Sequence, residues 1–417
     1  MPPVHQSTDF RRVALRATGG KVKAIFWHLG VRCALEERGF RFVTGFGPHV
    51  EPAPGEIAFL VGSSSGSIFS ILTAAGFDVP DIMESFLGRA SKMPPIHPSS
   101  IFRRHVPTPG RYFRRIRNAV NLRAGEELFP GTGLRQPDDT LTAEPQISPS
   151  RVKGVRRFIR YFRAGDLLVI RAPYILDGME AWVRSLIPDH DRFEDLRAHL
   201  FILASDLDAT RTAVFSTEDN DHLWYRYVSG VPISRASICS MAIPSVFNPV
   251  SVRIDGRKRY FIDGDVYNPT ETMIESDHHC DLAIVSSFEA PYRFHPAIGS
   301  LHHLGLPYEI TQTIALTIYS RLMQSRKNTR AKTKAMEITR DLLSRYLDEE
   351  TLERECERIA AAMEISLSMK TVFLHPYSNP LLFFGNPFDL SPRMFAKILV
   401  EATIQASELL DREGFRA

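Results

Sequence analysis

Short runs rich in apolar residues recur along the chain and alternate with longer stretches of helical periodicity. The runs of strand length cover residues 13–17, 57–61, 200–204, 282–285 and 371–374. Continuous apolar runs are typical of strands buried on both faces, as in a parallel sheet covered by helices. The helical patterns that would cover it occupy residues 24–38, 68–75, 308–368 and 394–412. We therefore expect an α/β protein with a mostly parallel central sheet sandwiched by helices.

This pattern breaks between about residues 88 and 195, where proline, arginine and aromatic residues replace the alternation. We predict a single domain, residues 1–417, into which residues 88–195 are inserted as a basic cap or membrane-contact region. Within it, residues 111–117 and 156–163 interleave arginine with aromatic rings, which suits an anionic membrane surface. A solvated basic helix face remains the alternative. Nucleic acid is disfavoured because no nucleic-acid-binding motif accompanies the charge.

The segment FLVGSSSGSIFS, residues 59–70, places three serines at the junction of a predicted strand and a predicted helix. Strand, Gly-x-Ser-x-Gly and helix together form a nucleophile elbow, whose sharp turn needs small residues two positions before and after the serine. Gly62 and Gly66 provide them around Ser64. The Ser64 hydroxyl would stand at a helix N-terminus, where aligned N–H groups favour developing negative charge. A serine-rich helix cap is the alternative interpretation.

A serine nucleophile needs a base. In the triad of an α/β-hydrolase the base would be a histidine, yet none of the five that follow in the second half lies in a strand-end loop with a matching acid: His278, His279, His302, His303 and His375. Asp263 follows the apolar end of a strand at residues 259–262 and precedes Gly264. At a strand end it can face the same crevice as Ser64. A simple Asp-Gly turn is the alternative.

Three separated segments resemble the patatin-like phospholipase family. GGKVKAIFWHLGVRCALEERG, residues 19–39, is similar to the glycine loop and following helix of that family, and GSSSG, residues 62–66, is similar to its elbow. Residues 237–270 resemble its segment that ends in Asp-Gly-Gly or Asp-Gly-Ala, here Asp263-Gly264-Asp265. The order and spacing of the three motifs make this resemblance far more specific than the elbow alone.

The resemblance implies a serine acyl-ester hydrolase of lipids, of phospholipase A or lysophospholipase type, that works through an acyl-enzyme. Ser64 would attack the ester and Asp263 would take its proton, which requires a close, partly desolvated Asp263 with a raised pKa. Backbone N–H groups of Gly19, Gly20 and Lys21 would form the oxyanion hole.

The chain departs from the family pattern at this same site. Lys21 stands at the third glycine of the loop, Ala24 at its last glycine, and Asp265 after the Asp-Gly pair. A second carboxylate would raise the pKa of Asp263, which would either tune the base or disable it. The alternative function is therefore a catalytically degenerate relative that binds a membrane or a partner.

Composition and cysteine spacing limit the expected cellular compartment and binding partners. The net charge is only +3, and the four cysteines are scattered without a C-x-x-C pair, which favours a reducing compartment. The first twenty residues lack the apolar core of a signal peptide, and no run of about 18 apolar residues is present. Adjacent His278, His279 and Cys280 rarely converge on one metal. We expect no cofactor or metal, a phospholipid or other acyl ester as substrate, and a cytoplasmic location with peripheral contact to anionic membranes as an open option.

Overall fold

A computed structural model provides the structure of the chain. It describes residues 4–89, 91–96, 103–104, 172–244, 246–267, 272–288, 291–292, 294, 296, 299–304, 306–363, 369–377 and 391–416. The main unit comprises Met1–Arg103 and Pro173–Ala417, and a second unit spans Arg104–Ala172. The arginine–aromatic stretches at 111–117 and 156–163, on which the predicted cap or membrane contact depends, lie outside the described residues.

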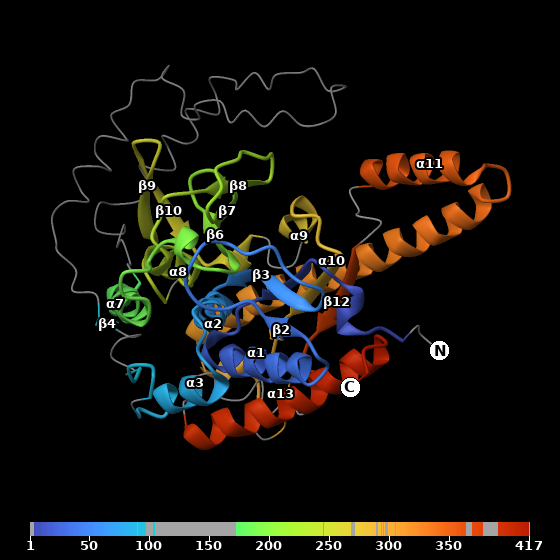
Figure 1. The fold of residues 1–417 in the computed structure, drawn as a ribbon. Coiled ribbons are helices and arrows are strands. Elements are labelled where there is room, and N and C mark those ends of the chain that lie inside the picture. Colours follow the sequence, from blue (N-terminus) through green and yellow to red (C-terminus); the bar gives the residue numbers. More distant parts are fainter. Residues whose placement is uncertain are drawn as a thin grey trace, which may run out of the picture. The chain divides into compact units, whose positions relative to one another are not determined.

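The main unit is built on a ten-stranded mixed sheet (Figure 1). Its central path runs β12-β11-β1-β3-β6-β10-β9, and the first five of these strands are parallel to one another. The strands of this path are β1 (Val13–Ala17), β3 (Glu56–Ser63), β6 (His199–Asp206), β9 (Val250–Ile254), β10 (Arg257–Ile262), β11 (Leu282–Ser286) and β12 (Lys370–Leu374). Short β2 (Arg41–Phe42) pairs with β3, while β7 (Arg211–Phe215) pairs with β6 and with β8 (Tyr225–Val228).

Helices flank this sheet, so the predicted α/β class is confirmed. The helices of the described residues are α1 (Lys21–Glu36), α2 (Ser65–Ala74), α3 (Val79–Phe86), α7 (Asp177–Leu186), α8 (Ile233–Ser240), α9 (Met273–Asp277), α10 (Leu306–Leu343), α11 (Glu349–Ala362) and α13 (Pro392–Arg412). The remaining short elements are β4 (Arg103–Arg104), β5 (Tyr174–Ile175) and 3-10 turns at Ser7–Asp9, Phe193–Asp195, Gly264–Val266 and Leu301–Leu304. Six predicted strands coincide with β1, β3, β6, β10, β11 and β12.

The two helices α1 and α13 lie side by side along the sheet (Figure 1). Gly30 of α1 allows this approach, because a Cβ there would lie 2.5 Å from the Cβ of Ala402. Phe26 of α1 stacks on Phe395 of α13 with ring centroids 4.0 Å apart. Both rings are almost completely buried, so this packing extends the apolar core beneath the first turn of α1.

The carboxyl ends of the parallel strands meet along one edge of the sheet. Ala17 at the end of β1 pairs with Gly62 of β3, and Ser63 pairs with Leu203 of β6. Strand β10 runs antiparallel to β6 but pairs only with its last two residues, Ser205 and Asp206. The chain that leaves β10 therefore crosses the same edge, where the loop after β1 and the turn after β3 also lie. Sequence alone did not predict this antiparallel approach.

Candidate active site

The turn between β3 and α2 has the geometry of a nucleophile elbow. Ser64 stands between the strand and the helix with φ 50° and ψ −127°, a conformation that non-glycine residues rarely adopt. A Cβ at Gly62 would lie 2.6 Å from the Cα of Ser67, and one at Gly66 would lie 2.1 Å from the carbonyl oxygen of Ala17. Both glycines are therefore required by close backbone approach. The strain at Ser64 directs its side chain away from the strand.

The three consecutive serines have three different environments. The Ser64 hydroxyl donates to Oδ2 of Asp263 at 2.6 Å. The Ser63 hydroxyl donates instead to Oδ1 of Asp265. The buried Ser65 hydroxyl has no hydrogen-bond partner among the described residues. Ser64 lines the pocket described below, and Ser63 and Ser65 are not among the residues that line it.

Asp263 is held by its backbone as well as by its side chain. Its N–H donates to the carbonyl of Ala242 at 3.0 Å, and its carbonyl accepts the Ser205 hydroxyl at 2.8 Å. Its Oδ1 accepts the N–H of Asp265 at 3.0 Å, which leaves Oδ2 for Ser64. The side chain is 5% exposed, so the carboxylate is both close to the serine and largely desolvated. The structure thus brings Ser64 and Asp263 together across 199 residues of sequence.

Gly264 allows the Asp263 turn to reach the sheet edge. A Cβ at this position would lie 2.2 Å from the carbonyl oxygen of Leu203 in β6 and 3.2 Å from the Cβ of Ser63. No larger residue fits between the turn and the ends of these two strands. The glycine therefore sets the distance at which the carboxylates on either side of it meet the serines of the elbow.

The loop after β1 faces the elbow. A Cβ at Gly19 would lie 2.7 Å from the Cβ of Ser64, so only glycine fits there. The N–H of Gly19, which the sequence analysis expected among the oxyanion donors, is already engaged, because it donates to Oδ2 of Asp265 at 2.7 Å. The next two residues, Gly20 and Lys21, have φ values of 145° and 64°, and their N–H groups form no hydrogen bond within the described part of the chain. Two free donors at the start of α1 thus lie beside the serine.

A pocket opens above these groups. Its polar side is formed by the loop, the elbow and the Asp-Gly turn, namely Gly20, Lys21, Ser64, Asp263 and Asp265. Its apolar side includes Ile243 and Val266 together with Ala315 and Ile318 of α10. Arg321, one turn further along α10, donates to the carbonyls of Val266 and Tyr267 and so ties this helix to the Asp-Gly turn. The pocket therefore combines an apolar wall with a polar floor.

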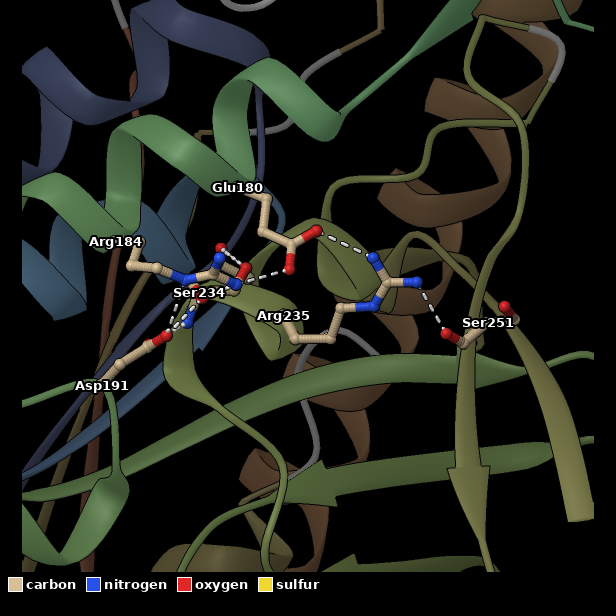
Figure 2. A network of polar contacts seen from close by, with 7 residues as sticks. Glu180, Arg184, Asp191, Ser234, Arg235 and Ser251 are labelled. Atoms are coloured by element: carbon tan, nitrogen blue, oxygen red, sulfur yellow. Dashed lines mark hydrogen bonds and ion pairs between the residues drawn. The ribbon is translucent and has the colours of Figure 1, made fainter.

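Helix α8 supports the elbow from behind. Its last residue, Ser240, accepts the N–H of Ser64 at 2.7 Å, which uses one of the donors at the start of α2. Figure 2 shows the polar contacts around the other end of this helix, where Asp191 accepts both the N–H and the hydroxyl of Ser234 at 2.7 and 2.6 Å. Arg235 links Glu180 of α7 to the carbonyl of Ser251 in β9. Sequence analysis did not find Ser240, because a lone serine at a helix end carries no signal.

His28 anchors the base of the loop. It is completely buried in α1, and its two ring nitrogens lie 2.7 Å from the carbonyl oxygen of Thr18 and the hydroxyl of Ser286. Burial lowers the pKa of His28 from its usual 6.5 to about 4, so the ring is neutral at neutral pH. Because the Thr18 carbonyl only accepts, Nε2 carries the proton and Nδ1 accepts from Ser286. The residue before Gly19 is thereby fixed.

The histidines considered for a triad lie elsewhere. None of them lines the pocket, and within the described residues none hydrogen-bonds Ser64. His278 lies 3.3 Å from Glu218, His302 contacts Glu309, and His375 contacts Arg326. In the part of the chain that the structure describes, no group of three or more His, Cys, Asp or Glu side chains could hold a metal ion. Over the same residues, no helix is long and apolar enough to cross a membrane.

The fold and this site define an α/β protein with an elbow serine hydrogen-bonded to an aspartate. The sequence profile of the patatin-like phospholipases matches residues 18–274, a span that contains the glycine loop, the elbow and the Asp-Gly turn. The chain belongs to the patatin-like phospholipase family, as its motifs predicted. Membership supports lipid acyl hydrolase activity in general terms, with lipids as substrates.

The chain was also compared with solved structures and with curated protein sequences. Among solved structures, the crystal structure of VipD from Legionella pneumophila is similar at a TM-score of 0.38 and 11% identity, over 99% of this chain and 70% of that chain. No curated protein sequence matches the chain.

Proposed function

We propose that the protein is a serine acyl-ester hydrolase of lipids, of phospholipase A or lysophospholipase type, in which Ser64 is the nucleophile and Asp263 the general base. The observation that carries this proposal is the 2.6 Å hydrogen bond from the Ser64 hydroxyl to Asp263 at the floor of the pocket. Family membership supports the reaction class.

In the acylation step, Oγ of Ser64 attacks the carbonyl carbon of the ester while its proton passes to Oδ2 of Asp263. The carbonyl oxygen becomes an oxyanion, for which the unpaired N–H groups of Gly20 and Lys21 are donors beside the serine. When the tetrahedral intermediate collapses, the bond to the leaving alcohol breaks and Asp263 returns the proton to that alcohol. The acyl group remains as an ester on Ser64.

In the deacylation step, a water molecule attacks the acyl-enzyme and gives its proton to Asp263. The second tetrahedral intermediate then releases the carboxylic acid, and Asp263 returns the proton to Oγ of Ser64. One residue thus acts as base and then as acid in both halves of the reaction. The apolar side of the pocket, with Ile243, Val266 and Ile318, suits an acyl chain.

The proposed setting is the cytoplasm, with peripheral contact to the membrane that supplies the substrate. All four cysteines are free thiols, which accords with a reducing compartment. No cofactor takes part in the proposed steps. The membrane contact through residues 88–195 remains a prediction from the sequence.

The test compares esterase activity on short and long acyl esters for the wild type and Ser64→Ala, with fluorophosphonate labelling mapped by mass spectrometry. Ser64→Ala is expected to abolish hydrolysis and labelling, because the bond-forming oxygen is lost. Ser65→Ala is the matched control, since this buried hydroxyl has no hydrogen-bond partner among the residues that the structure describes and does not line the pocket. This variant is expected to keep its activity. Labelling of another serine would contradict the assignment of Ser64. An inactive, unlabelled wild type would favour the degenerate binding protein.

A further inference from the structure

A carboxylate that the proposed reaction does not use lies within the site. Asp265 is 2% exposed, and both of its side-chain oxygens accept hydrogen bonds, Oδ2 from the N–H of Gly19 at 2.7 Å and Oδ1 from the Ser63 hydroxyl. Its own N–H donates to Oδ1 of Asp263. One residue thus joins the glycine loop, the elbow and the base, which are the three motifs of the site.

The fit at Gly19 shows how closely this contact is built. A Cβ on Gly19 would lie 2.1 Å from Oδ2 of Asp265, so no other residue at position 19 would admit the carboxylate. Burial of a carboxylate is costly unless donors satisfy its oxygens, and here a backbone amide and a hydroxyl do so. These two hydrogen bonds therefore stabilise the Asp265 side chain in this buried position.

The bond to Gly19 also determines which amides remain for substrate. Because the Gly19 N–H is engaged, the unpaired N–H groups of Gly20 and Lys21 are the remaining donors of the loop. Both residues have positive φ, and Lys21 bears a side chain that disfavours this conformation. Such a segment keeps its conformation only if the surrounding structure holds it. Two contacts hold the residues that lead into it, since His28 fixes Thr18 and Asp265 fixes Gly19.

We propose that Asp265 is a positioning residue that fixes the glycine loop, so that the N–H groups of Gly20 and Lys21 face the oxyanion formed at Ser64. This inference rests on the proposed function. It assigns a role to the residue at which the chain departs from the Asp-Gly-Gly pattern. Asp265 acts through the loop and does not itself touch the reacting atoms.

The experiment measures kcat and KM on a soluble short-chain ester for Asp265→Ala, Asp265→Gly and Asp265→Asn, together with thermal unfolding. Alanine and glycine remove both side-chain contacts, and both occur at this position in the family pattern, so the backbone is expected to accommodate them. Asparagine keeps both, since its amide oxygen accepts from Gly19 and its NH₂ donates to Ser63. We expect the two truncations to lower kcat by about 10²-fold, the scale for the loss of an oxyanion donor, with little change in KM. Asn is expected to recover most of that loss.

Asp206→Ala is the matched control. This buried aspartate also accepts hydrogen bonds on both side-chain oxygens, from the N–H groups of Asp208 and Ala209 and from the guanidinium of Arg259, but it does not line the pocket. It is expected to lower the melting temperature and leave kcat unchanged. Wild-type kcat in folded Asp265→Ala and Asp265→Gly would overturn the inference, as would an Asn variant no better than Ala, or an equal loss of kcat in Asp206→Ala. An inactive wild type would refute the proposed function instead, so the two failures are distinct.

Discussion

Two serine–aspartate pairs lie next to each other where the parallel strands end, and the same hydrogen bond joins each serine to its aspartate. Ser64 donates to Asp263, and Ser63 donates to Asp265. Ser63 ends a regular strand and is 1% exposed, whereas Ser64 has a strained backbone and lines the pocket. The second acceptor also holds the N–H of Gly19. The two pairs are chemically identical, so what distinguishes them is the backbone conformation of the serine and its access to the pocket.

The largest expected difference between the pairs concerns the acceptors. Asp263→Asn is expected to reduce kcat by roughly 10²–10⁴-fold, because the amide cannot take the Ser64 proton. Asp265→Asn is expected to reduce kcat much less, because asparagine keeps the contacts with Gly19 and Ser63. Steady-state kinetics on one ester measures both.

If a histidine were the general base, a histidine substitution and not Asp263→Asn would abolish activity. Single substitutions of the histidines at positions 278, 279, 302, 303 and 375 are the controls, and each is expected to leave most of the activity. One essential histidine together with a dispensable Asp263 would show that the α/β-hydrolase triad is the correct mechanism.

A smaller effect, on the free energy of unfolding, is expected from His28, which contacts Thr18 at the base of the glycine loop. The pKa of His28 is lowered to about 4 in the folded state and is near 6.5 when unfolded. Between these values the unfolded chain binds a proton that the folded chain does not, so the free energy of unfolding is highest above pH 6.5 and falls as the pH drops toward 4. The full pKa shift corresponds to a loss of about 3 kcal/mol in the free energy of unfolding over this pH range.

Urea unfolding of the wild type and His28→Gln across this pH range measures that contribution. The variant is expected to show a shallower pH dependence. Equal slopes for both proteins would mean that His28 does not titrate in this way.

The smallest expected effect is that of Ser63→Ala. The substitution removes one of the donors to the buried Asp265, which is expected to lower the free energy of unfolding by roughly 1–3 kcal/mol. Activity is expected to fall less than about tenfold, because the bond to Gly19 remains. Denaturant unfolding and the esterase assay separate the two effects. A loss of activity as large as that of Ser64→Ala would show that the two serines are not distinct in function.

The sequence predicted the architecture and the family because both depend on local patterns. Buried parallel strands are apolar throughout, and the elbow requires glycine at two fixed positions, so these features are visible without a structure. Strands β7, β8 and β9 were missed, since they lack a continuous apolar run. Ser64 and Asp263 were predicted to lie together, and the structure places their oxygens 2.6 Å apart.

The role of Asp265 was beyond sequence analysis. Its charge suggested an effect on Asp263 through like-charge repulsion, but its side chain is directed to Gly19, 246 residues away. That contact requires that residue 19 has no Cβ and that β10 crosses the end of β6. Neither requirement can be recognised from a local sequence pattern. The catalytic roles of these residues stay predictions until they are measured.

The close approach of Gly66 to the Ala17 carbonyl has a consequence for motion. The start of α2 rests on the end of β1, so the turn that carries Ser64 and the strand that precedes the glycine loop can separate only in a large-scale opening. Amide hydrogens in these segments are then expected to exchange with solvent slowly, whereas α10, much of which is exposed, exchanges through smaller openings. Because α10 supplies Ala315 and Ile318 to the pocket wall, the proposed reaction on a long acyl chain would be expected to move this wall, while the floor of the pocket stays in place.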